Sequence, residues 1–133
     1  LAQSDAVADR VFAAAWRRPD PGSFCLEDLT WRTAAGDPDV TEVLRSRYLA
    51  PFAADAEFGR IVLDSVRSYL ANDRRISAAA RALSVHENTL RYRLQKFEQL
   101  TGARLDATET LVELCWAFEA CPGGTAMPVD GPL

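Results

Sequence analysis

The side chains best suited to chemistry in this chain of 133 residues gather between residues 74 and 96. They combine guanidinium, carboxamide, hydroxyl, imidazole and phenol groups. Arginine can bind guanine at two points in a DNA major groove, asparagine can bind adenine in the same way, and a threonine methyl group can touch a thymine methyl. The stretch therefore predicts a DNA-reading surface with these candidate contacts: Arg74, Arg75, Ser77, His86, Glu87, Asn88, Thr89, Arg91, Tyr92, Arg93 and Lys96.

The candidate contacts divide by the part of the duplex that each would reach. Asn88, Thr89 and Arg91 carry groups that suit base edges. Cationic side chains suit phosphates, which orient a protein on DNA without reading its sequence. The expected phosphate contacts are Arg74, Arg75, Arg93 and Lys96. Free backbone N–H groups beside Ser77, at the start of a helix, are expected to take a further phosphate.

Three of the candidates each keep two interpretations. Glu87 suits the positive end of a helix, and its carboxylate can also accept a hydrogen bond from cytosine. His86 either bonds locally at the start of a helix or contacts DNA. Tyr92 either contacts a phosphate or packs as a half-exposed side chain.

Two short helices must hold these side chains in place. Ser77 is expected to cap a first helix over residues 78–83, which breaks at Ser84 and Val85. A second helix runs from about residue 86 to residue 100 and ends at Thr101, with Gly102 just beyond it. Its apolar side chains are expected to pack on the first helix: Leu90, Leu94, Phe97 and Thr101 on Ala79, Ala80 and Leu83. The pattern predicts a helix-turn-helix whose second helix enters the major groove. The alternative is a plain three-helix bundle with arginines on its surface.

The rest of the chain also has helical periodicity. Expected helices cover about residues 5–17, 26–34, 38–48, 55–72 and 108–120, and Asp37 with Pro38 marks the clearest start. The expected inner faces are Val40, Val43, Leu44 and Tyr48 on the third of these helices, and Leu111, Leu114, Cys115 and Phe118 on the last. No segment sustains period-two alternation, so the sequence predicts an all-α fold. A helical domain containing the helix-turn-helix is expected at 55–120, preceded by a helical linker segment at 1–54 and followed by a disordered tail at 121–133.

The charge distribution supports a DNA-contacting segment within an acidic chain. The net charge is −4, which argues against indiscriminate binding of nucleic acid. Residues 72–104 nevertheless carry seven basic and three acidic side chains, a balance of +4. A basic segment of this kind is typical of a DNA-binding module, although a solvated basic face remains the alternative.

Other function classes find little support in the sequence. The chain has three cysteines without CxxC spacing and one histidine, so we expect no metal site, and thiols in a reducing cytoplasm. No phosphate-binding glycine loop or nucleophile elbow is present, so we expect neither an enzyme nor a cofactor. No apolar run approaches the roughly 20 residues needed to cross a membrane.

The run from Val85 to Gly102 resembles the C-terminal helix-turn-helix of the PucR/CdaR family of bacterial transcription regulators. The signature is H-x-N-T-L-x-Y-R-L, formed here by His86, Asn88, Thr89, Leu90, Tyr92, Arg93 and Leu94. The resemblance covers about residues 62–118. It implies a cytoplasmic regulator that binds double-stranded promoter DNA as a homodimer or larger assembly, with a sensor domain upstream. Because the first residue is leucine, we expect the chain to be part of a longer protein.

A second hypothesis belongs to a different class. The same helical fold can serve chiefly as a dimerisation or protein-interaction module with little direct DNA reading. Val112 and Trp116 fall off the expected inner face of the last helix, which favours a dimer interface there. The alternative is that Trp116 packs at the edge of the domain.

Overall fold

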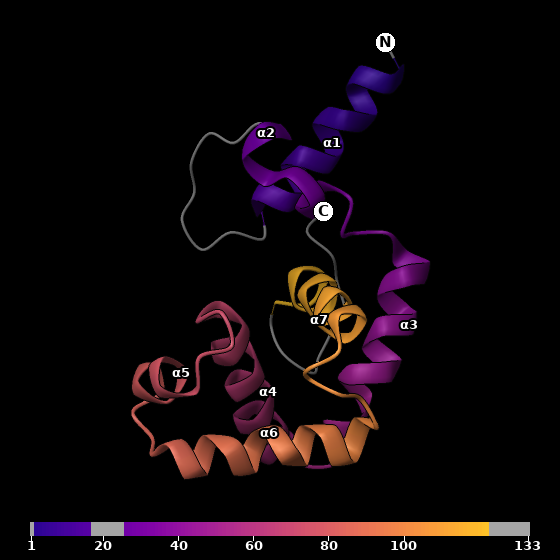
Figure 1. Cartoon of the computed structure of the whole chain (residues 1–133). Coiled ribbons are helices and arrows are strands. Elements are labelled where there is room, and N and C mark those ends of the chain that lie inside the picture. Colours follow the sequence, from indigo (N-terminus) through magenta and orange to yellow (C-terminus); the bar gives the residue numbers. More distant parts are fainter. Residues whose placement is uncertain (1, 17–25, 123–133) are drawn as a thin grey trace.

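The computed structural model describes residues 2–16 and 26–122, and within these ranges it contains helices and no strand (Figure 1). The predicted all-α fold is therefore confirmed for the described part of the chain. The elements follow in the order α1 (Ala2–Trp16), α2 (Leu26–Leu29), the short 3-10 helix η1 (Thr30–Thr33), α3 (Pro38–Tyr48), the 3-10 helix η2 (Ala50–Phe52), α4 (Ala56–Ala71), α5 (Ile76–Ala82), α6 (Glu87–Thr101) and α7 (Thr108–Ala120). No helix in these ranges is long and apolar enough to cross a membrane.

Aspartates start the two helices that precede the helix-turn-helix. The Oδ1 atom of Asp37 accepts hydrogen bonds from the N–H groups of Asp39 and Val40, both at 3.0 Å, and Pro38 occupies the first turn of α3. Asp55 accepts from the N–H of Phe58 at 3.0 Å and begins α4 in the same way. Each side chain satisfies N–H groups that a helix start leaves without intrahelical partners. The predicted start at Asp37 and Pro38 is confirmed.

Aromatic rings join the linker helices to the helix-turn-helix. Phe97 of α6 is fully buried, and its ring stacks on Tyr48 at 6.3 Å and on Phe52 at 5.8 Å between centroids. Gly59 of α4 allows the close approach of α4 to η2, because a Cβ atom at residue 59 would lie 2.7 Å from the carbonyl oxygen of Phe52. The end of α3, η2 and the helices α4 to α7 therefore share one hydrophobic core.

Two helices turn faces to the core that differ from the predicted ones. On α3, Leu44 and Tyr48 are buried as predicted, but Val40 and Val43 are exposed and Thr41 takes an inner position. The cause is the direction of α7, which packs along α3 and sets its rotation. Hydrophobicity alone does not determine that rotation.

The last helix is rotated in a similar way. Leu114 and Ala117 of α7 are buried, whereas Cys115 is exposed and its predicted core position is wrong. Leu114 and Ala117 belong to the shared hydrophobic core, so α7 is rotated with Cys115 towards the outside. Beyond α7, Cys121 occupies the C-cap position and is buried. Residues 123–133 and Cys25 lie outside the described residues.

Candidate nucleic-acid interface

The turn between α5 and α6 has a tightly bonded backbone. Ser84 adopts a left-handed conformation with φ of 56°, and the N–H of Val85 donates to the carbonyl oxygen of Ala80 at 3.0 Å. Ala79 and Ala80 are buried under α4 and α6, where larger side chains would push the helices apart. Compact packing of α5 on α6 is the arrangement expected of a helix-turn-helix.

The turn before α5 presents two of the predicted basic contacts. Asp73 and Arg74 both have positive φ, at 55° and 63°, and the N–H of Arg74 donates to the carbonyl oxygen of Tyr69 at 2.7 Å. Arg74 and Arg75 are exposed, and a guanidinium nitrogen of Arg75 lies 3.5 Å from a carboxylate oxygen of Asp73. The backbone therefore projects both arginines into solvent beside the start of α5.

Ser77 does not cap α5, so its predicted role as N-cap is wrong. The helix begins at Ile76, and Arg75 holds the N-cap position without a side-chain hydrogen bond. Asp73 and Arg74, both with left-handed backbone, are followed by extended backbone at Arg75. The helix therefore starts two residues earlier than predicted. Ser77 is exposed within the first turn.

His86 caps α6 with its ring. The N–H of Asn88 donates to Nδ1 of His86 at 3.0 Å. A ring nitrogen that accepts is unprotonated, so in the neutral ring the hydrogen sits on Nε2. Local bonding of His86, one of its two predicted interpretations, is therefore present, and only Nε2 remains as a donor to another group.

The remaining candidate contacts lie on the outward side of α6 and along the edges of its buried face. Leu90, Leu94 and Phe97 are buried, as predicted for the scaffold of this helix. The other residues divide into two groups by exposure: Asn88, Thr89, Arg91 and Tyr92 are exposed, and Glu87, Arg93 and Lys96 are half-buried. The structure thus brings these seven side chains together on one helix.

Polar side chains at the start of α6 bind one another. The Nη2 atom of Arg91 lies 3.1 Å from Oε2 of Glu87, and its Nη1 atom donates to Oδ1 of Asn88 at 3.2 Å. On another part of the helix, the Lys96 ammonium lies 5.4 Å from the centroid of the Tyr92 ring. A cation at that distance is attracted to the ring face.

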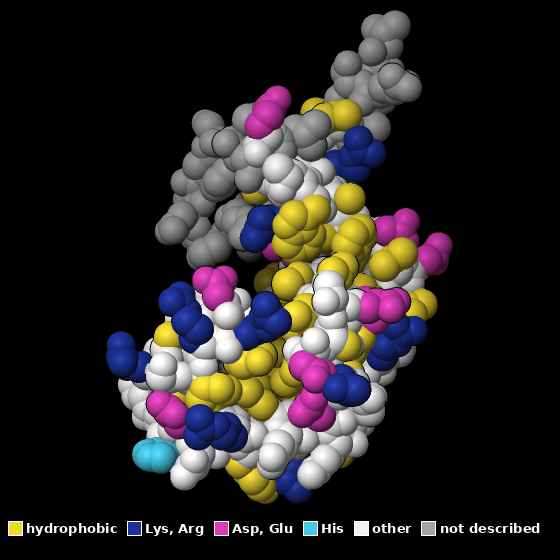
Figure 2. Space-filling model, in the orientation of Figure 1, with side chains coloured by type: hydrophobic (Ala, Val, Ile, Leu, Met, Phe, Trp, Pro, Cys, Tyr) yellow, Lys and Arg dark blue, Asp and Glu magenta, His cyan; other side chains and the backbone are white. Residues whose placement is uncertain are grey.

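Positive charge in this region is partly compensated. The guanidinium of Arg104 pairs with Asp106 at 2.7 Å and lowers the pKa of the Asp106 carboxyl. Arg74, Arg81 and Arg93 form no ion pair with any residue in the described ranges. In Figure 2, basic side chains are spread over the side of the molecule formed by α4, α5 and α6. Arg81 was not among the predicted contacts, although its charge and its place on the first helix of the motif were visible in the sequence.

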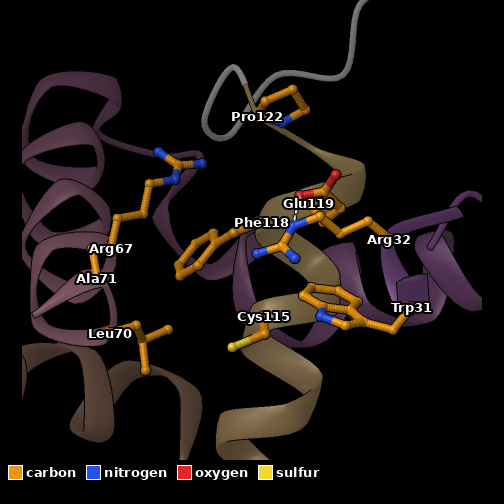
Figure 3. Close-up of a pocket in the computed structure, with 9 residues that line it drawn as sticks. All are labelled: Trp31, Arg32, Arg67, Leu70, Ala71, Cys115, Phe118, Glu119 and Pro122. Carbon is orange, nitrogen blue, oxygen red and sulfur yellow. Dashed lines mark ion pairs between the residues drawn. The ribbon is translucent and has the colours of Figure 1, made fainter. Parts of the chain in front are cut away.

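A second surface lies between α7 and η1. It forms a hollow of about 400 Å³. Figure 3 shows that Trp31 and Arg32 face Phe118 and Cys115 in this hollow. Arg67 closes one side, with its guanidinium 4.6 Å from the centroid of the Phe118 ring and a hydrogen bond of 3.2 Å to the carbonyl oxygen of Cys121. Burial lowers the pKa of Arg67.

An apolar hollow of about 380 Å³ adjoins this one and shares Trp31 and Cys115 with it. Its remaining lining is Thr108, Leu111, Val112 and Trp116. Val112 is 59% exposed and Trp31 is 39% exposed. Hydrophobic side chains gather over α7 and the segment above it in Figure 2. Within the described residues, no group of His, Cys, Asp and Glu side chains is arranged to hold a metal ion.

Comparisons with known proteins agree with this geometry. A sequence profile of the PucR C-terminal helix-turn-helix domain matches residues 62–120. The match confirms the family resemblance, and its range contains α5, α6, α7 and most of α4. No solved structure shows a significant match to the chain.

Several curated proteins are similar over part of their length. The uncharacterised protein YsfB of Bacillus subtilis is 42% identical over 40% of this chain and 14% of its own. The transcriptional activator PmfR of Paenarthrobacter nicotinovorans is 32% identical over 69% of this chain and 21% of its own. The uncharacterised protein Rv2242 of Mycobacterium tuberculosis is 31% identical over 74% of this chain and 23% of its own. The chain therefore spans less than a quarter of the length of these relatives.

Proposed function

We propose that the chain, whose residues 62–120 match the PucR C-terminal helix-turn-helix domain, binds double-stranded promoter DNA as part of a transcriptional regulator. The similarity to the transcriptional activator PmfR supports this proposal. The main observation in its favour is the arrangement of side chains on α6. Amide, hydroxyl and guanidinium groups lie on its outward side, opposite a buried apolar face. A helix of this kind, held by a second helix through a tight turn, suits a DNA major groove.

The proposed contacts divide between bases and phosphates. Asn88, Thr89 and Arg91 lie in the first turns of α6, the part of a recognition helix that reaches base edges. The cations around them would meet phosphates: Arg74 and Arg75 before α5, and Arg93 and Lys96 on α6. Arg81 joins this second group, because it is exposed and has no ion pair within the described ranges. His86 orients α6 and can offer only its Nε2–H to a phosphate.

Selection of bound duplexes from a random pool tests the proposal, followed by titration of the selected duplex at several salt concentrations. We expect one enriched sequence and an affinity that falls steeply with salt. Each neutralised phosphate makes the decrease of log association constant with log salt concentration steeper by about 0.9. Arg91→Ala with Arg93→Ala should weaken binding and reduce that slope.

A matched control removes the same charge elsewhere. Arg10→Ala with Arg45→Ala takes two arginines from α1 and α3, outside the helix-turn-helix, and should leave the slope unchanged. If the wild-type chain enriches no sequence and shifts no duplex at low salt, DNA binding is wrong for this chain.

We further propose that two copies pair through the apolar surface formed by Trp31, Leu111, Val112, Cys115 and Trp116. In Figure 1, α6 runs along one end of the molecule and α7 lies above it, and α7 supplies most residues of this apolar surface. A two-fold axis that lies along this surface and runs in the direction from α7 to α6 would place both α6 helices at the same end, as a palindromic DNA site requires. Among the described residues, the Nε1 atom of Trp116 is buried and has no hydrogen-bond partner, and the Trp116 ring is half-buried.

Sedimentation equilibrium over a wide concentration range tests the dimer. Val112→Glu should shift the equilibrium to the monomer, because it places a charge in the apolar surface. Val43→Glu is the control, since Val43 of α3 is also exposed, at 53%, and lies outside that surface. A wild-type chain that stays monomeric throughout, or equal effects of the two variants, would contradict pairing through α7.

A further inference from the structure

We infer that Glu87 positions the guanidinium of Arg91 for one guanine, and thereby sets which base pair α6 reads. The inference rests on the proposed DNA binding and assigns Glu87 a role other than direct base contact. The two side chains lie one helical turn apart, at i and i+4, with Nη2 of Arg91 3.1 Å from Oε2 of Glu87. Both are partly exposed, at 53% for the Arg91 side chain and 43% for that of Glu87.

Two acceptors hold the Arg91 guanidinium. Glu87 bonds Nη2, and Oδ1 of Asn88 bonds Nη1 at 3.2 Å, so each terminal nitrogen has one partner from the helix itself. A long arginine side chain otherwise loses considerable rotamer freedom when it docks on a base. Holding the planar group before the encounter reduces that loss and fixes the direction of the remaining donors.

Donor counting shows that the held guanidinium can still read a base. Arginine carries five N–H donors in one plane, and Glu87 and Asn88 occupy two of them. Three donors remain, and guanine needs two, at O6 and N7. The Oδ1 atom of Asn88 accepts from Arg91, so Asn88 is a second support for the guanidinium, and its Nδ2 amide group can still donate to a base.

The rival explanation is that Glu87 reads DNA itself by accepting from the amino group of cytosine. The two explanations differ in which base pair responds to a change. If Glu87 acts through Arg91, substitutions at both residues affect the same base pair, and removing both has no more effect on base preference than removing Arg91. If Glu87 reads cytosine, the two residues affect different base pairs and their effects add.

The experiment selects duplexes with the wild-type chain and then measures the affinity of each single-base variant of the selected duplex. The proteins are wild type, Glu87→Gln, Arg91→Lys, Arg91→Ala and the double variant Glu87→Gln with Arg91→Ala. We expect Arg91→Lys to lose discrimination at one G·C pair by about tenfold, since lysine cannot form the two-point contact. Glu87→Gln should lose about two- to fivefold at the same pair, while its affinity for unrelated duplexes rises because a negative charge is removed.

Glu109→Gln is the matched control. Glu109 lies in the first turn of α7 as Glu87 does in α6, so this change removes the same charge from a helix start without touching Arg91. It should leave base preference unchanged. The inference is overturned if Glu87→Gln keeps the wild-type preference at every position, or if its effect falls on another base pair and adds to that of Arg91→Ala. Failure of the proposed function would look different, because then the wild-type chain would select no duplex at all.

Discussion

His86 illustrates how a residue with an expected DNA contact can serve first as a structural cap. Its Nδ1 atom accepts from the N–H of Asn88, and it thereby satisfies one of the N–H groups that α6 leaves unpaired at its start. The side chains of the first turn of α6 depend on this cap for their orientation, which links the stability of the helix to its reading face.

Replacement of His86 should therefore affect stability in a way that depends on capping ability. His86→Ala should lower the free energy of unfolding by about 0.5–2 kcal/mol, because alanine offers no acceptor to the Asn88 N–H. His86→Asn should retain most of it, since asparagine is a favourable N-cap. Urea denaturation measures both, and equal destabilisation by the two variants would contradict the capping role.

At the scale of the elements, Ser84 holds a backbone conformation that most residues avoid. Its φ of 56° lets the chain turn between α5 and α6 within a few residues. Left-handed backbone is unfavourable by about 1–2 kcal/mol per residue for most side chains, and most of all for β-branched ones.

Substitutions at Ser84 should follow this backbone preference. Ser84→Val should lower the free energy of unfolding by about 1–2 kcal/mol, whereas Ser84→Gly should leave it unchanged or raise it slightly. Ser46→Val provides the control, because Ser46 is exposed in the ordinary helical backbone of α3. Thermal and urea unfolding measure these changes, and a Ser84→Val variant no weaker than Ser46→Val would contradict strain at the turn.

The sequence predicted elements well where local chemistry decides them. Asp37 and Pro38 begin α3, and Gly102, with φ of 72°, ends α6, because capping and left-handed backbone depend on a few neighbouring residues. The start of α5 was missed because the left-handed pair before it, Asp73 and Arg74, consists of residues that have no strong turn signal together.

Helix rotation was predicted less well, for a different physical reason. Val43 and Cys115 are as hydrophobic as their buried neighbours, yet both are exposed. Which face of α3 or α7 turns inward depends on how the two helices pack on each other, and periodicity along one helix carries no information on its partner. The sequence predicted the outward residues of α6 because the apolar face of this helix is narrow and regular. The contacts among Glu87, Asn88 and Arg91 could not be predicted from the sequence, because they depend on side-chain geometry.

At the scale of the whole molecule, a polar bridge ties α3 to α7. The hydroxyl of Tyr48 donates to Glu113 at 2.5 Å, and Nη1 of Arg47 lies 2.8 Å from both carboxylate oxygens of Glu113. The Tyr48 hydrogen bond and the Arg47 charge lower the pKa of Glu113. Burial together with the hydrogen bond to Glu113 raises the pKa of Tyr48 to about 12.

These pKa shifts predict how stability depends on pH. A lowered carboxyl pKa contributes stability above the ordinary value near 4.5, and this contribution disappears as the pH falls through the lowered pKa. A raised tyrosine pKa contributes stability that is complete below about 10 and is lost as the pH rises towards 12.

Tyr48→Phe should therefore reduce the free energy of unfolding by about 1–2 kcal/mol near neutral pH, and the difference from wild type should shrink at acid and at strongly alkaline pH. Tyr92→Phe is the control, because Tyr92 is 54% exposed on α6. Chemical denaturation at a series of pH values gives the comparison. A difference for Tyr48→Phe that stays constant across the whole series would contradict the bridge.

The shared core also bears on where the folding unit begins. We propose a boundary near Asp37 in place of the expected division at residue 55, because Leu44, Tyr48, Leu49 and Phe52 contribute to the same core as α6. A chain of residues 37–122 should unfold cooperatively, whereas a chain of residues 55–122 should be destabilised or fail to fold. Calorimetry and near-UV circular dichroism distinguish the two, and equal stability of both chains would support the division at 55.

The aromatic stack of Tyr48, Phe97 and Phe52 has a consequence for how such genes can recombine. A crossover placed just before α4 would transplant Phe97 without the two rings that cover it, and the recipient would have to supply rings of matching shape. Exchange of DNA-reading modules between related regulators should therefore succeed with crossover points upstream of α3, and fail with points between η2 and α4 unless the recipient carries aromatic residues equivalent to Tyr48 and Phe52.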